Sequence, residues 1–178
     1  MTSGGKAKRI LTGSCSDSGP YVWGGFDAMR ILPRKYNDAP SEGSRPLSAK
    51  TAGFVPGSGA GALVLESLES ALERNATIYA EVLGGSVNSG GQRNGGSMTA
   101  PNASAVQRCI KEALAIAEVK ASEIDYINAH GTSTPVGDVG EVEAVRAVFE
   151  GIKQPVISST KSMTGHSQGA TGAQELGA

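Results

Sequence analysis

Apolar residues recur along this chain with two spacings, one typical of helices and the other typical of strands. A spacing of three to four residues predicts helices at 21–32, 67–74, 106–118, 138–149 and 169–178. Short apolar or alternating runs predict strands at 10–12, 62–65, 77–83, 124–129 and 156–159. Strands and helices alternate through most of the chain, which indicates a layered α/β domain.

Polar residues indicate where several of these helices begin or end. Ser104-x-x-Gln107 and Asp138-x-x-Glu141 have the form of capping boxes. Asn75 and Asn102 match the glycosylation pattern, but we expect them to be a helix end and a helix cap.

The chain has 25 glycines, and they cluster most densely in three segments, at 57–61, 84–96 and 165–172. The run Gly57-x-Gly59-x-Gly61 resembles a nucleotide-binding fingerprint, but it precedes a strand instead of linking a strand to a helix. We therefore predict that these glycines allow close backbone packing.

Composition excludes several classes of protein. A chain of 178 residues with 39% hydrophobic residues is long enough for one domain with an adequate core. A net charge of -1 gives no excess of positive charge for nucleic acid or anionic membranes. Cys15 and Cys109 are too few for a disulfide framework or a metal site, and no apolar run approaches bilayer length. We expect a cytoplasmic protein with no nucleic-acid or membrane partner.

The chemistry of the sequence gathers around its two histidines, His130 and His166. Each follows a short strand-like run and lies in a segment rich in Gly, Ser and Thr, so we expect the two to share one site. Two neutral imidazoles directed at one oxygen form an oxyanion hole. Lys161 adds positive charge that opposes protonation of His166. The alternative is that each histidine is a turn residue satisfied by the backbone.

Two longer motifs carry a family resemblance. Asn128-Ala-His-Gly-Thr-Ser-Thr-Pro-Val-Gly-Asp138 and the stretch Ser159–Ala173 closely resemble the two catalytic motifs of β-ketoacyl-[acyl-carrier-protein] synthases. The chain is most similar to the type II synthases of fatty-acid elongation. The resemblance continues through Ser44-Arg-Pro46, Gly53–Glu66 and Ile78–Val82, so it covers nearly the whole sequence.

The resemblance implies a fold, a reaction and a set of site residues. The fold would be thiolase-like, with alternating helix and sheet layers, incomplete in this chain, and the family is usually homodimeric. The reaction would be a decarboxylating Claisen condensation of an acyl thioester with malonyl-carrier protein. No cofactor of the protein's own is implied, because acyl carrier protein brings the substrates on its phosphopantetheine arm. The residues to which the resemblance gives roles are His130, His166 and Lys161 as catalytic groups, Thr132 and Thr134 as contacts to phosphopantetheine, and Asp138, Glu141 and Glu175 as a network around the lysine.

The resemblance also predicts how the chain divides. Residues 1–90 correspond to the end of the N-terminal thiolase-like half, and 91–178 correspond to most of the C-terminal half. We expect the family's nucleophilic cysteine and its extreme C-terminal segment to lie outside this sequence. Cys15 lacks a helix-start pattern, and a reactive thiolate needs a helix N-terminus or a neighbouring cation. We therefore expect the chain alone not to condense its substrates, and an incomplete sheet to favour association.

Two other classes of function stay open at the level of sequence. The first is a non-catalytic partner that completes a nucleophile-bearing chain or binds carrier protein. The second, which we favour less, is a hydrolase with a Ser/His/Asp triad.

Overall fold

The computed structural model of the chain describes residues 7–91 and 100–178. In chain order, the helices and strands of this part are β1 (Arg9–Ser16), α1 (Pro20–Ala28), β2 (Gly59–Glu66), α2 (Leu68–Glu73), α3 (Ala103–Ala117), β3 (Tyr126–Asn128), α4 (Pro135–Val148), β4 (Val156–Ser158), α5 (Lys161–Thr164) and α6 (Thr171–Gly177). Short 3-10 turns of the same part lie at Pro40–Glu42, Ala121–Glu123 and Gln168–Ala170.

The strands form two separate pairs. β1 and β2 make a long antiparallel ribbon in which Arg9 is opposite Glu66 and Ser16 is opposite Gly59. β3 and β4 run parallel, with Tyr126 opposite Val156, and α4 provides the crossover that a parallel pair requires.

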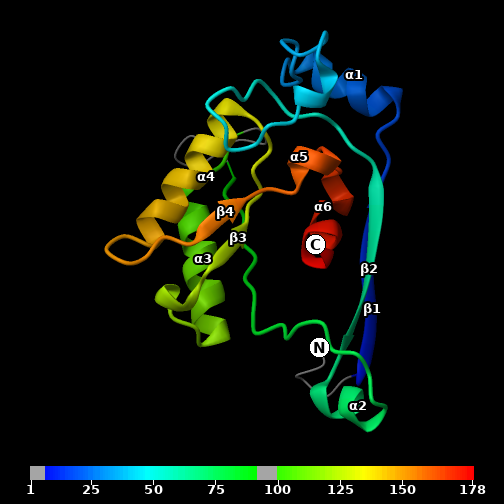
Figure 1. Cartoon of the computed structure of the whole chain (residues 1–178), viewed down its shortest axis with the longest axis vertical. Coiled ribbons are helices and arrows are strands. Elements are labelled where there is room, and N and C mark those ends of the chain that lie inside the picture. The colour runs from blue at the N-terminus through cyan, green and yellow to red at the C-terminus, as the bar shows by residue number, and fades with distance from the viewer. Residues whose placement is uncertain (1–6, 92–99) are drawn as a thin grey trace.

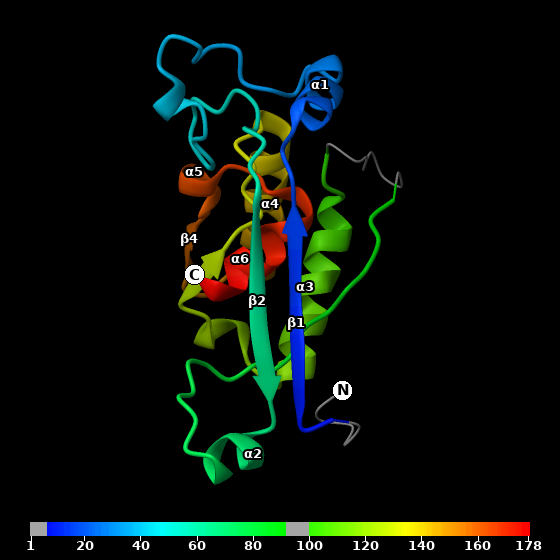
Figure 2. The same ribbon diagram turned by 90° about the vertical axis from the view of Figure 1, so that its right-hand side faces the viewer.

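The elements stack in layers. α3 packs against α4 on one side of the β3–β4 pair, and α6 contacts both strands of the β1–β2 ribbon (Figure 1). The view turned by 90° shows the ribbon standing in front of α6 (Figure 2). This arrangement confirms the layered α/β class, and it places the C-terminal helix between the two strand pairs.

The core is concentrated on the helical side of the molecule. Phe149 and Ala144 of the α4 segment are 1% and 0% exposed, and Ala105 of α3, the helix that packs against α4, is also buried. The ribbon is different, because Leu11 is 76% exposed and Val64 is 61% exposed.

The glycine run of β2 packs as predicted. A Cβ atom at Gly57 would lie 2.4 Å from the carbonyl oxygen of Thr164, and one at Gly61 would lie 2.8 Å from the Cβ of Ala173. Both distances are shorter than real Cβ contacts, so only glycine lets α5 approach residue 57, just before β2, and lets α6 approach β2 itself this closely.

The predicted capping boxes at Ser104 and Asp138 are wrong, whereas Asn102 as a helix cap and Asn75 as a helix end are confirmed. α3 begins at Asn102, whose side chain accepts from the Ala105 amide, so the expected capping box at Ser104 is not the cap. α4 begins at Thr134, which places Asp138 and Glu141 inside the helix. Their carboxylates accept hydrogen bonds from backbone amides outside the helix, those of Leu47, His130 and Gly131. Asn75 ends the segment of α2 with a left-handed φ of 53°, as its predicted role requires.

Some element boundaries also differ from the prediction. β1 extends to Ser16 instead of ending at residue 12, and so includes Cys15, while α1 ends at Ala28 instead of 32. The strand predicted at 77–83 is wrong, since this exposed segment pairs with no strand in the described residues. Its alternating pattern is not sufficient, because an extended segment becomes a strand only when a neighbour satisfies its backbone. Part of the glycine-rich segment 84–96 lies outside the described residues.

Within residues 7–91 and 100–178, no helix combines the length and the apolar character that a membrane crossing requires.

Candidate active site

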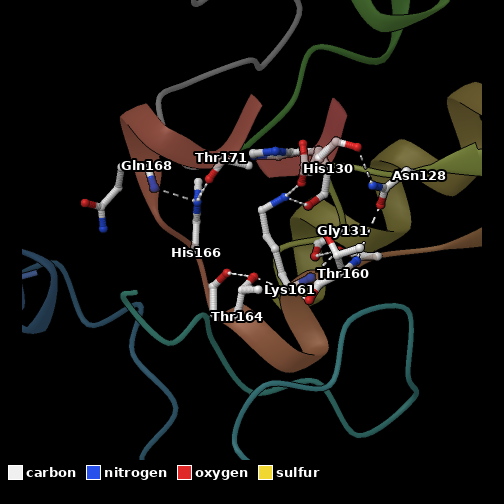
Figure 3. A network of polar contacts seen from close by, with 12 residues as sticks. Asn128, His130, Gly131, Thr160, Lys161, Thr164, His166, Gln168 and Thr171 are labelled. Atoms are coloured by element: carbon white, nitrogen blue, oxygen red, sulfur yellow. Dashed lines mark hydrogen bonds and ion pairs between the residues drawn. The ribbon is translucent and has the colours of Figure 1, made fainter. Parts of the chain in front are cut away.

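The structure brings the two histidine loops together. His130 lies between β3 and α4, and His166 lies just after α5. Their ring centroids are 5.1 Å apart, with an angle of 85° between the ring planes (Figure 3). Residues 36 positions apart in the sequence therefore form one site, as expected.

Lys161 connects the loops at the centre of this site. It is the first residue of α5, and it is 1% exposed. Its Nζ donates to the carbonyl oxygen of His130 at 2.5 Å and forms an ion pair with Glu175 of α6 (Figure 3). A buried ammonium requires such partners, so one side chain ties α5 and α6 to the first histidine loop.

Glu141 and Asp138 hold the surrounding backbone instead of contacting the lysine. The two oxygens of Glu141 each accept a backbone hydrogen bond of 2.7 Å, one from the His130 amide and one from the Gly131 amide. Asp138 is 4% exposed and accepts from the Leu47 amide at 2.7 Å. Of the acidic residues predicted around Lys161, Glu175 makes the direct contact, Glu141 holds the first histidine loop, and Asp138 holds the backbone of Leu47.

His166 is held through both its backbone and its ring. Its amide donates to the Val55 carbonyl at 2.8 Å, and its own carbonyl accepts from the Gly57 amide at 2.9 Å. The Gln168 amide donates to Nδ1 of the ring at 3.2 Å, and the Thr171 hydroxyl lies 3.2 Å from the same nitrogen. Because a backbone amide only donates, Nδ1 accepts, and the hydrogen of the neutral ring is assigned to Nε2.

The surroundings keep both rings neutral near pH 7. Burial, followed by the charges of His130 and Lys161, lowers the pKa of His166 from its ordinary value of 6.5 to about 4. The pKa of His130 is also lowered, first by loss of water and then by the charge of Lys161, although Glu175 and Asp138 oppose this shift. His130 nevertheless keeps part of its surface exposed. Two neutral imidazoles are hydrogen-bond donors suited to a developing oxyanion.

Thr132 and Thr134 form a hydroxyl pair beside the first histidine. Their Oγ1 atoms are 2.8 Å apart, and the Thr134 side chain makes no capping bond to α4 although it occupies the cap position. A Cβ atom at Gly137 would lie 2.3 Å from the Thr134 hydroxyl, so the first turn of α4 leaves space for the pair. The hydroxyls are therefore placed together, as a contact to a substrate arm would require.

Sequence reasoning missed several residues that build the site. The Asn128 side chain donates to the Glu175 carbonyl at 3.3 Å, and Ser44 Oγ donates to the Lys161 carbonyl at 2.5 Å. The ring of Phe54 lies 5.2 Å from the ring of His166. Asn128 could have been found, because it is the last residue of the strand that carries the first loop. Ser44 and Phe54 are distant in the sequence and gave no such signal.

Sequence reasoning also missed that Gly165-His-Ser-Gln-Gly169 has the G-x-S-x-G spacing of a hydrolase elbow. The structure does not support that function. Ser167 is fully buried and its Oγ donates to the Ser58 carbonyl at 3.4 Å. An elbow places an exposed serine at a turn from a strand into a helix, whereas this serine follows α5 and precedes a 3-10 turn.

Cys15 does not have the surroundings of a reactive thiol. It is exposed in β1, opposite Ala60, and the next helix starts five residues later at Pro20. In the part of the chain that the structure describes, no cluster of His, Cys, Asp and Glu is arranged to hold a metal ion.

Comparison with known proteins identifies the family. The family described as "Beta-ketoacyl synthase, C-terminal domain" matches residues 79–178, and "Beta-ketoacyl synthase, N-terminal domain" matches residues 3–71. The chain belongs to the β-ketoacyl synthase family.

Curated relatives agree with this membership. The chain is 51% identical over 150 residues to 3-oxoacyl-[acyl-carrier-protein] synthase 1 of Haemophilus influenzae and to the Escherichia coli protein of the same name, covering 84% of this chain and 35% of each relative. This chain therefore spans about a third of the length of the curated relatives it matches.

Solved structures agree with the fold. A β-ketoacyl synthase from Burkholderia phymatum superposes with a TM-score of 0.88 at 40% identity, over 98% of this chain and 41% of that one. A type II polyketide ketosynthase in complex with its acyl-carrier protein, AntDE:AntF, also gives 0.88, at 37% identity over 97% of this chain and 42% of that one. These likenesses confirm the thiolase-like layered fold.

Proposed function

We propose that this chain carries the histidine and lysine part of the active site of a 3-oxoacyl-[acyl-carrier-protein] synthase of fatty-acid biosynthesis. The observation that carries the proposal is the pair of neutral imidazoles, whose ring centroids are 5.1 Å apart. Burial lowers the pKa of both rings, the charge of the buried Lys161 adds to this effect, and Lys161 also holds the backbone of His130. The curated relatives bear the name of this enzyme.

In the condensation, the two imidazole rings would stabilise the enolate that forms when the malonyl thioester loses CO₂. The bond between the carboxylate and Cα of a malonyl thioester breaks, CO₂ leaves, and the electron pair moves into a thioester enolate. Hydrogen bonds from His130 and His166 stabilise the enolate oxygen, which carries the developing charge. The enolate carbon then attacks an acyl thioester, forms the new C–C bond and expels a thiolate. Lys161 acts on this step through the rings, because its positive charge opposes their protonation.

The substrate arm would run past the threonine pair. Thr132 and Thr134 would hydrogen-bond the amides of phosphopantetheine, so the protein would need no cofactor of its own. Acyl carrier protein would be the partner, in a cytoplasmic homodimer of the whole synthase. A ketosynthase of similar structure is known in complex with an acyl-carrier protein, which supports this partner.

The thiol that accepts the acyl group is assigned to no residue of this chain. Cys15 lies on the strand β1 and not at the helix N-terminus that can activate a thiol, since the next helix starts at Pro20. We therefore expect no condensation by this chain alone. The non-catalytic partner is not favoured, because the relatives are named as synthases and the histidine pair has the geometry that their reaction would use.

A chimera tests the proposal. The matched stretch of the E. coli synthase is replaced with that of this chain, and acetyl-carrier protein formed from malonyl-carrier protein is measured by intact mass. We expect decarboxylation and condensation, with His130→Ala and His166→Ala each lowering the rate by roughly 10²–10³-fold. A folded chimera without decarboxylation, or histidine variants with full activity, would contradict the proposal.

The isolated chain supplies a second measurement. Its intact mass is compared before and after incubation with an acyl-carrier-protein thioester, with Cys15→Ala as the control. We expect no acyl adduct. An adduct that the substitution abolishes would make Cys15 the nucleophile and would overturn this part of the proposal.

A further inference from the structure

We propose that Ser133 is a positioning residue that sets the spacing of the two threonine hydroxyls by fastening their loop to the segment Ser44–Phe54, called here the bridging segment. Only the identity of the ligand rests on the proposed function. The role of Ser133 itself rests on its own contacts.

Ser133 occupies an unfavourable backbone conformation in a fully buried position. Its φ is +66° and its exposure is 0%. A left-handed residue other than glycine costs on the order of 1–3 kcal/mol and persists only where its surroundings enforce it. An interaction that glycine could not make must therefore compensate for the cost of a serine at this position. Such an interaction would be the reason for serine here.

The bridging segment makes two hydrogen bonds to Ser133, and the one to its side chain supplies that reason, because glycine could not accept it. The Arg45 amide donates to Ser133 Oγ at 3.0 Å, and the Gly53 amide donates to the Ser133 carbonyl at 2.9 Å. The side chain and the backbone of Ser133 thus hold the two ends of the stretch from Arg45 to Gly53. Gly53 is itself fixed as glycine, since its φ is +138° and a Cβ atom would lie 2.3 Å from the Ile31 carbonyl.

The left-handed turn explains the geometry of the threonine pair. In an extended strand, side chains at positions i and i+2 leave the backbone roughly 7 Å apart. Thr132 and Thr134 have this relation in sequence, yet their hydroxyls are 2.8 Å apart. The turn at Ser133 therefore brings the two side chains together, and the bonds from Arg45 and Gly53 hold the turn.

The bridging segment also contacts the rest of the site. Leu47 donates to Asp138 of α4, and Ser44 donates to the carbonyl of Lys161. Phe54 packs against the ring of His166. Ser133 is thus the point at which the first histidine loop is attached to a segment that also touches the second loop.

The test compares Ser133→Ala with Ser133→Gly in the whole chain. Both variants remove the acceptor for the Arg45 amide, and Ser133→Gly removes the cost of the left-handed turn as well. Ser133→Cys keeps the size of the side chain and a weak acceptor, and it serves as the conservative rescue. Ser122→Ala, in an exposed 3-10 turn, is the matched control.

Two readouts are used. The first is the set of NMR methyl resonances of Thr132 and Thr134, which requires no ligand. We expect Ser133→Ala and Ser133→Gly to shift and broaden both methyl signals, Ser133→Cys to do so less, and Ser122→Ala to leave them unchanged. The second is the dissociation constant for malonyl-pantetheine, which we expect to rise at least tenfold in the Ala and Gly variants.

The outcomes separate this inference from the proposed function. Folded Ala and Gly variants with unchanged threonine resonances would overturn the positioning role, even if their stability fell. Should Ser133→Ala fail to fold, Ser133→Gly decides the question, because its backbone adopts the turn freely. A wild-type chain that does not bind malonyl-pantetheine would count against the proposed function, while the methyl resonances would still decide the role of Ser133.

Discussion

The two histidines of the site are held by different kinds of interaction. The backbone of His130 is held by charged side chains, since its amide donates to Glu141 and its carbonyl accepts from Lys161. The backbone of His166 is held by neutral partners, the backbone groups of Val55 and Gly57, and its ring accepts from the Gln168 amide. Charge therefore positions the first histidine, and close packing beside β2 positions the second. Substitutions that remove charge should therefore affect mainly His130, and substitutions that disturb packing should affect mainly His166.

The largest effect is expected from Lys161→Met, which acts on the charged side of this comparison. It leaves Glu175 without its buried partner and the His130 carbonyl without its donor, and breaking a buried pair typically costs about 3–5 kcal/mol of stability. The pKa of each histidine should rise, because burial remains but the positive charge that also lowers both values is lost. Denaturant unfolding and NMR titration measure the two effects.

Lys153→Met is the matched control for this prediction. Lys153 pairs with Asp125 at 3.1 Å, and the two side chains are 74% and 87% exposed. A solvent-exposed pair contributes about 0–1 kcal/mol, so this variant should stay close to wild type. Equal losses in the two lysine variants would mean that Lys161 does not organise the site.

The next largest effect is expected from Glu141→Gln, which should loosen the first loop alone. A glutamine has one acceptor oxygen where the carboxylate serves both the His130 and the Gly131 amides, so one of two charge-assisted bonds is lost. We expect a loss of about 1.5–3 kcal/mol. Amide hydrogen exchange should accelerate at His130 and Gly131 but not at His166. Glu143→Gln, on the same helix and exposed, is the control, and acceleration of exchange in both loops would contradict the comparison.

The sequence was informative where chemistry and spacing act locally. His130 follows the strand β3 as predicted, although the short helix α5 lies between β4 and His166, and the glycines of β2 pack as closely as expected. The sequence could not show that Asp138 would accept from Leu47, or that Ser133 would adopt a left-handed turn, because both depend on segments nearly a hundred residues away. The alternating pattern at 77–83 predicted a strand wrongly, because the pattern is local whereas a strand also needs a neighbouring strand to pair with.

The packing side of the comparison is tested by Gly61→Ala. A methyl group there would meet the Cβ of Ala173 at 2.8 Å and its backbone carbon at 2.9 Å, so α6 must move away from the ribbon. Overpacking of this kind costs about 1–3 kcal/mol. We expect the NMR signals of His166 to change more than those of His130, because α6 carries Thr171, whose hydroxyl lies beside the His166 ring.

Gly59→Ala provides the internal control for this prediction. Its added methyl group would meet the end of the Gln174 side chain, which can turn aside without moving the helix. Its loss of stability should therefore be smaller than that of Gly61→Ala. The reverse order would show that the approach of α6 to β2 does not limit the position of the second loop.

The smallest effect concerns pH and the ring of His166. Its pKa is about 4 in the folded chain against an ordinary value of 6.5, so the unfolded chain binds the proton more readily. The stability that this ring contributes is complete above pH 6.5, falls as the pH drops from 6.5 towards 4, and changes no further below that value. The full shift corresponds to roughly 3 kcal/mol, and solvent screening at a half-buried ring reduces it to about 1–2 kcal/mol.

Comparison of the wild type with His166→Gln isolates this contribution from the carboxylates that titrate in the same range. The difference in unfolding free energy between the two proteins should narrow between pH 6.5 and 4. Direct NMR titration should place the pKa of the His166 ring well below its ordinary value. A ring that titrates near 6.5 would be charged in a substantial fraction of molecules at neutral pH. A protonated ring would lose the hydrogen bond from the Gln168 amide. His166 would then not be held by neutral partners, as its contrast with His130 requires.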